Sequence, residues 1–143
     1  MARSTYPVEV LTPEGQVYEG EVEMISTRTA TGSLGVLAHH APLMAILEPT
    51  ELKLYTSGSE NPGSAEVERF AQGEGYLQVV DNSALLIVED ALRIDEIDRP
   101  ALESRLEDAR QSLEGSEEGS EEQNRCRREI ARAEAFLAID ESA

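Results

Sequence analysis

The chain has little of several things that other protein classes need. Of its 143 residues one is cysteine and none is tryptophan, and aromatic residues make up only 4%. The single thiol, Cys126, excludes an internal disulfide and a zinc site built from cysteines. No apolar run approaches the ~20 residues of a membrane-spanning helix. The first seven residues lack the apolar stretch of a secretory signal, so we expect a cytoplasmic protein.

Positive charge is also scarce. The chain has 12 Lys and Arg against 29 Asp and Glu, which gives a net charge of -17 at neutral pH. Such a balance argues against a nucleic-acid partner, whose phosphates need cations, and against direct docking on anionic lipid. We attribute the charge to solubility, with an acidic surface that steers a partner as the alternative.

Residues 1–90 carry the pattern of a β-rich domain. Short apolar stretches alternate with polar residues at a period of two and are separated by turn signals such as Asp81-Asn82 between Tyr76–Val80 and Ala84–Val88. About eight to ten strands in this length predict an antiparallel β-sandwich or flattened barrel.

The pattern becomes helical after a linker at residues 91–98. In residues 99–143, Asp98 is a plausible helix N-cap and Gly115 a stop signal. Apolar or small residues recur at steps of four and three in two stripes, which are Leu102, Leu106, Ala109 and Leu113, and then Cys126, Ile130, Ala133 and Leu137. The spacing predicts two helices that pack as an antiparallel hairpin with one narrow seam.

Catalytic and metal-binding groupings are absent from the sequence pattern. His39 and His40 are adjacent, so on a strand they would point to opposite faces, and we predict no metal site. Gly73-Glu74-Gly75 leads into a strand rather than a helix, which indicates a turn and not a phosphate loop. Cys126 falls on the packed stripe of the second helix, where a structural thiol is expected. These patterns point to no catalytic site, although paired-carboxylate chemistry stays open because carboxylates are abundant.

The most specific motif runs from Gly32 to Leu43, GSLGVLAHHAPL. This pattern, G-x-L-G followed by H-A-P-L, resembles the signature of the epsilon subunit of F-type ATP synthases, called delta in mitochondrial naming. The similarity continues along the chain, in order and spacing, at Val8–Gly15, Gly75–Val79 and Leu85–Ala91. The resemblance implies a β-sandwich followed by two C-terminal helices.

The resemblance also implies a role. Family members are non-catalytic central-stalk subunits of a proton- or sodium-driven rotor, and they couple the gamma shaft to the membrane c-ring. In many bacteria the helical hairpin also extends along the shaft and blocks ATP hydrolysis. The implied location is the cytoplasmic face of the plasma membrane, reached only through the complex.

Specific residues follow from this similarity. The surface that faces the c-ring maps onto Ser33, Leu34, Gly35, His39, His40 and Pro42, with Ser33 where the family usually has Glu. We predict inhibitory contacts with the alpha and beta subunits through Arg125, Arg127, Arg128 and Arg132 of the second helix.

A nucleotide motif of the family, [IL]-D-x-x-R-A, is degenerate here. Ile97, Asp98 and Arg99 are present, but Ala101 stands where the motif has Arg. A bidentate phosphate contact tolerates little displacement of its arginine. We therefore predict weak or no ATP binding and no other cofactor.

A second hypothesis stays open from the sequence. The chain would then be a free-standing regulatory or ligand-binding β-sandwich with an acidic helical tail. A gene position next to an ATP synthase beta gene would favour the first hypothesis, and binding of a small molecule by the isolated chain would favour the second.

Overall fold

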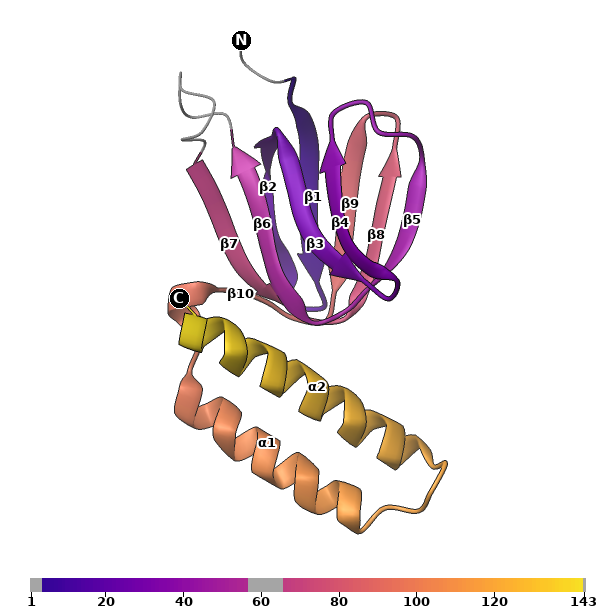
Figure 1. The fold of residues 1–143 in the computed structure, drawn as a ribbon, viewed down its shortest axis with the longest axis vertical. Helices are drawn as coiled ribbons and strands as arrows, with labels where there is room; N and C mark the ends of the chain where they lie inside the picture. The colour runs from indigo at the N-terminus through magenta and orange to yellow at the C-terminus, as the bar shows by residue number, and fades with distance from the viewer. Residues whose placement is uncertain (1–3, 57–65, 143) are drawn as a thin grey trace.

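The computed structural model describes residues 4–56 and 66–142. Ten strands form a sheet that folds over itself into a β-sandwich, and two helices lie across one end of it (Figure 1). The strands are β1 (Tyr6–Thr12), β2 (Gly15–Val22), β3 (Met24–Thr29), β4 (Gly32–Leu37), β5 (Leu43–Leu47), β6 (Thr50–Thr56), β7 (Glu66–Gln72), β8 (Gly75–Val80), β9 (Ser83–Val88) and β10 (Ala91–Arg93). A 3-10 turn, η1 (Ile94–Glu96), leads to the helices α1 (Arg99–Glu114) and α2 (Glu121–Ser142). This architecture confirms the predicted fold class.

The strand order is β10-β7-β6-β3-β5-β8-β9-β1-β2, with β4 paired to β3 off this path. Strand β3 joins the two halves of the sandwich, because Met24 to Ser26 pair with β6 while Thr29 pairs with Leu47 of β5. The described pairs are antiparallel except β1 and β9, which run parallel. No hairpin turn fixes the relative direction of these two strands, since they are far apart in the sequence.

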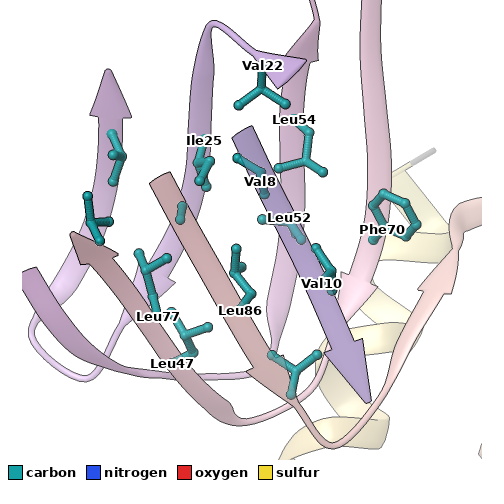
Figure 2. Close-up of a cluster of buried hydrophobic side chains, with 14 of the residues drawn as sticks. Val8, Val10, Val22, Ile25, Leu47, Leu52, Leu54, Phe70, Leu77 and Leu86 are labelled. Atoms are coloured by element: carbon teal, nitrogen blue, oxygen red, sulfur yellow. The ribbon is translucent and has the colours of Figure 1, made fainter. Parts of the chain in front are cut away.

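The core of the sandwich is built from inward-facing aliphatic residues. Val8 and Val10 of β1 lie opposite Leu52 and Leu54 of β6, and Phe70 of β7 closes one side (Figure 2). Each buried side chain of this size contributes about 1.5–3 kcal/mol relative to exposure. The period-two pattern read from the sequence is therefore the pattern of this core.

Two local features fix the turn between β8 and β9 and the pairing beside it. Asp81 and Asn82 have φ angles of 50° and 57°, as a two-residue hairpin turn requires. Gly75 begins β8 so close to its neighbour that a Cβ atom there would lie 1.9 Å from the carbonyl oxygen of Ile87. Glycine is thus required for β8 and β9 to pair at this end.

The region predicted as a linker, residues 91–98, differs in part from that prediction. Ala91–Arg93 form strand β10 on β7, and η1 follows directly. The strand is fixed by the side chain of Arg93, which binds the carboxylate of Glu68 and lies 5.0 Å from the ring centre of Phe70. These contacts with β7 lie about twenty-five residues away in the chain, and local composition carries no sign of them.

The helical hairpin packs on the sandwich as well as on itself. Asp98 caps α1 by accepting a hydrogen bond from the Ala101 N–H at 3.1 Å, as predicted. The predicted stripes supply buried residues to the seam, which are Leu102, Leu106, Ala109, Cys126 and Ala133. In addition, Phe136 and Ile139 of α2, which lie outside the predicted stripe, are buried in a cluster with Ala71 of β7.

Candidate functional site

One outer face of the sandwich is apolar and uncovered in the structure. It is formed by β5, β8 and β9, and the exposed fractions of its side chains are 71% for Met44, 63% for Ile46, 57% for Tyr76 and 45% for Ile87. The register aligns Ile46, Tyr76 and Ile87 in one row across these strands. We call these four residues the apolar face. Contiguous exposed apolar residues of this kind mark an interaction surface.

The apolar face was not predicted from the sequence, although a signal for it is present there. Residues 43–47 are apolar without interruption, and a strand that lacks polar alternation has both of its faces in apolar surroundings. One of these faces is the sandwich core, to which Leu47 belongs. The other face carries Met44 and Ile46, whose side chains are exposed.

The residues predicted to face the c-ring lie in two places, within β4 and in the segment that follows it. Ser33, Leu34 and Gly35 lie within the strand rather than in a loop, because they pair with Arg28, Thr27 and Ser26 of β3. Ser33 and Gly35 are exposed, whereas Leu34 is half-buried against the sandwich core. The first part of the predicted surface is therefore a strand edge.

The remaining predicted residues lie beyond the end of β4, next to the β8–β9 turn. The backbone N–H of His39 donates to Oδ1 of Asn82 at 2.7 Å, and His39 itself has a φ of 65°. The Nδ1 atom of His40 lies 2.7 Å from the carbonyl oxygen of Ala41. Among residues 4–56 and 66–142 no cluster of metal ligands occurs, at this pair of histidines or elsewhere.

The residues of the degenerate nucleotide motif stabilise the helical hairpin. Arg99 binds Asp140 at 3.0 Å (Nε to Oδ2), Glu103 at 3.2 Å and Glu141 at 3.3 Å. The hydrogen bond with Asp140, followed by that with Glu103, raises the pKa of the Arg99 guanidinium above its ordinary value. Ile97 packs against the hairpin cluster, and Asp98 caps α1. Arg99 is thus paired with carboxylates near the end of α2.

The hollow between the hairpin and the sandwich has a lining that disfavours phosphate. Its volume is about 480 Å³. Arg105 and Arg132 contribute positive charge, but carboxylates outnumber them among the lining residues, which are Glu14, Asp90, Leu92, Leu102, Arg105, Asp108, Glu129, Arg132, Ala133 and Phe136. A polyphosphate would meet net negative charge here.

The four arginines predicted to make inhibitory contacts do not share one environment. Arg125, Arg127 and Arg128 are exposed on α2. Arg132 is half-buried, and its Nη1 atom lies 3.4 Å from Glu74 Oε1 and 3.4 Å from Asp90 Oδ2, both in connections of the sandwich. In this conformation Arg132 holds the hairpin to the sandwich.

A β-sandwich with an open apolar face and an appended helical hairpin defines an accessory subunit that acts by docking. Comparison with known proteins identifies the family. The family model described as "ATP synthase, Delta/Epsilon chain, beta-sandwich domain" matches residues 5–94. The chain belongs to this family of ATP synthase delta and epsilon chains, as its sequence motifs predicted.

Relatives named ATP synthase epsilon chain match over nearly the whole chain. The Persephonella marina protein is 36% identical over 135 residues, which cover 94% of this chain and 95% of the relative. The Syntrophomonas wolfei protein is 33% identical and covers 97% and 95%. The chain is therefore a non-catalytic central-stalk subunit of an F-type ATP synthase, and the hypothesis of a free-standing ligand-binding sandwich is not supported.

Solved structures share the fold. A chain in the structure of the Euglena gracilis mitochondrial ATP synthase, OSCP/F1/c-ring, superimposes with a TM-score of 0.73 at 21% identity, covering 96% of this chain and 82% of that one. A chain in the Tetrahymena thermophila mitochondrial ATP synthase central stalk/c-ring gives a TM-score of 0.57 at 18% identity, with 98% and 99% covered. Within the described part of the chain, neither helix is long and apolar enough to span a membrane.

Proposed function

We propose that the sandwich binds the gamma subunit through the apolar face and carries torque between gamma and the c-ring. The observation that supports this most directly is the aligned row of Ile46, Tyr76 and Ile87, with Met44 beside it. Burying these side chains against a partner would remove apolar area from water, at about 25 cal/mol per Å². A rotor subunit needs such a contact because it must move with the shaft.

The test uses the purified full chain and the alpha-beta-gamma subcomplex of the same enzyme. Ile46→Asp places a charge in the apolar face, and we expect at least a tenfold loss of affinity, equivalent to about 1.4 kcal/mol. Val67→Asp is the matched control, because Val67 is exposed on β7, in the other half of the sandwich. Unchanged binding by a folded Ile46→Asp variant would contradict the proposal.

For the c-ring, we propose the end of the sandwich at His39, His40 and Pro42, with the exposed edge of β4 at Ser33, Leu34 and Gly35 beside it. Support comes from exposure: His39, His40, Pro42, Ser33 and Gly35 are all exposed. Charge reversal at His40 to Glu is expected to weaken binding of the assembled stalk to purified c-ring. Retention of full binding would remove this residue from the interface.

We further propose that the division into residues 1–90, 91–98 and 99–143 is functional, with the hairpin acting as a separate inhibitory unit. Arg125, Arg127 and Arg128 are free of the sandwich core and would contact carboxylates of the alpha and beta subunits, joined by Arg132 once its pairs with the sandwich break. Truncation after Asp98 should raise ATP hydrolysis by the assembled complex. Unchanged hydrolysis would contradict an inhibitory role.

For the location, we propose the cytoplasmic face of the plasma membrane, in a bacterial-type complex. The organisms of the similar epsilon chains, such as Persephonella marina and Chloroflexus aurantiacus, support this. The chain would reach the membrane only through its complex. Fractionation that recovers the chain with washed membranes only while the catalytic head is attached would agree with it.

A further inference from the structure

The two halves of the sandwich differ in charge. Strands β1, β2, β5, β8 and β9 contain no charged residue except Glu9, Glu19 and Glu21. The strands of the other half carry both signs, namely Arg28, Glu51, Lys53, Glu66, Glu68, Arg69 and Arg93. Charge is therefore not spread evenly over the strands, and in one half every charged strand residue is acidic.

The glutamates share the outer surface that carries the apolar face. Glu9 of β1 pairs with Glu19 of β2 on one side and with Leu85 of β9 on the other. Leu85 pairs in turn with Gln78, which pairs with Met44. One row across the sheet thus runs from an exposed methionine to two carboxylates.

The adjacent row of the sheet follows the same division of the outer surface into an apolar and an acidic part. Glu21 of β2 pairs with Pro7 of β1, on the same outer side as Glu9 and Glu19. A hollow of about 390 Å³ spans the boundary and is lined by residues of both parts, including Pro7, Glu9, Glu19, Gln78, Val80 and Leu85. The surface is therefore apolar over β5, β8 and β9 and acidic over β1 and β2.

The acidic part does not stabilise the isolated chain. Like charges directly opposite each other on neighbouring strands are destabilising, and Glu9 and Glu19 have this arrangement. Glu9 accepts a hydrogen bond from the neutral amide of Gln16 at 2.5 Å, and within residues 4–56 and 66–142 it forms no ion pair. A partner that brings cations to this position would relieve the repulsion.

We propose that the gamma surface seated on the apolar face continues over β1 and β2 with lysine or arginine side chains that pair with Glu9, Glu19 and Glu21. This inference rests on the proposed function and specifies the chemistry of its partner. Apolar contacts would supply affinity, whereas the charges would speed association and fix the orientation of the sandwich on the shaft. The acidic composition thereby gains a specific role on one surface.

The experiment measures association and dissociation rates of the full chain with the alpha-beta-gamma subcomplex at several salt concentrations. The variant carries E9Q, E19Q and E21Q, and the control carries E117Q, E118Q and E122Q, which remove the same charge from exposed positions at the hairpin turn. We expect the first variant to associate about tenfold more slowly at low salt, with a flatter salt dependence, and the control to match the wild type.

Each outcome decides between defined alternatives. Equal slowing in both variants would show that net charge matters and not this surface, which would overturn the inference. An unchanged rate in the first variant would overturn it as well. If the wild type fails to bind, the proposed function itself is wrong. Misfolding is controlled by thermal denaturation, where the first variant should be at least as stable as the wild type because a like-charge pair is removed.

Discussion

The sandwich and the hairpin are stabilised in different ways. The sandwich encloses its own core, in which residues such as Leu77, Leu86 and Phe70 are fully buried. The hairpin has a narrow seam of small and aliphatic residues, and it completes its core only by placing Phe136 and Ile139 against Ala71 of the sheet. We therefore expect the sandwich to fold without the hairpin and the hairpin to depend on the sandwich.

The largest effect should come from the core of the sandwich. Phe70→Ala deletes a fully buried ring that forms a T-shaped pair with the ring of Tyr18, with the ring centres 6.1 Å apart. We expect a loss of about 4 kcal/mol in the free energy of unfolding, with both regions affected together. Urea denaturation followed by circular dichroism measures it, because the chain has no tryptophan.

Phe70→Leu is the matched control for that substitution. It keeps an apolar side chain of similar volume and should cost less than about 1.5 kcal/mol. If the hairpin stayed folded while Phe70→Ala unfolded the sandwich, the dependence of the hairpin on the sandwich would be disproved.

A smaller and local effect is expected at the contact between the two regions. Phe136→Ala removes the buried ring of α2 that lies in the cluster with Ala71. We expect about 3 kcal/mol less protection against hydrogen exchange in α1 and α2, while the amides of β8 and β9 keep theirs. Ala138→Gly, at an exposed position of the same helix, is a control for helix propensity alone and should cost about 1 kcal/mol. Equal loss of protection in both regions would mean that they unfold as one unit.

The smallest effect is expected on the stability of the sandwich at acid pH. Arg69 donates to both carboxylate oxygens of Glu51 at 2.8–3.0 Å, and this hydrogen bonding lowers the pKa of Glu51 below its ordinary value of 4.5. A carboxyl group with a lowered folded-state pKa stabilises the fold above its unfolded pKa and loses this contribution as the pH falls through the folded value. The sandwich should therefore weaken below about pH 4.5.

Glu51→Gln tests the acid effect. The variant should lose about 1 kcal/mol near neutral pH and show a shallower decline of stability on acidification. Glu66→Gln, on the same strand pair but exposed, is the control and should follow the wild type. Parallel pH curves for the wild type and Glu51→Gln would contradict the assignment.

Much of this architecture could be predicted because its signals are local. The turn at Asp81-Asn82, the cap at Asp98 and the stripe through Leu102 and Leu106 each depend on residues within a few positions of one another. The motif from Gly32 to Leu43 identified the family, since it combines several residue types in fixed order. The fold and the family were therefore accessible from one sequence.

The site was less accessible because its geometry depends on distant residues. Arg99 meets Asp140 across 41 positions, and Arg132 meets Glu74 across 58. The exposure of Met44 and Ile46 depends on which strands lie beside β5. It also depends on whether another element of the chain packs against that face. Sequence alternation cannot distinguish a face buried in the chain's own core from one reserved for another subunit.

The hydrogen bond between the backbone of His39 and the side chain of Asn82 has a mechanical consequence. It joins the end of β4 to the turn of the β8–β9 hairpin, so a sideways load on either loop is shared between both halves of the sandwich. Strands resist such a load as a set, because the ladder of hydrogen bonds between them must shear together. In a rotating part, this hydrogen bond therefore braces the end of the sandwich that we propose to face the c-ring.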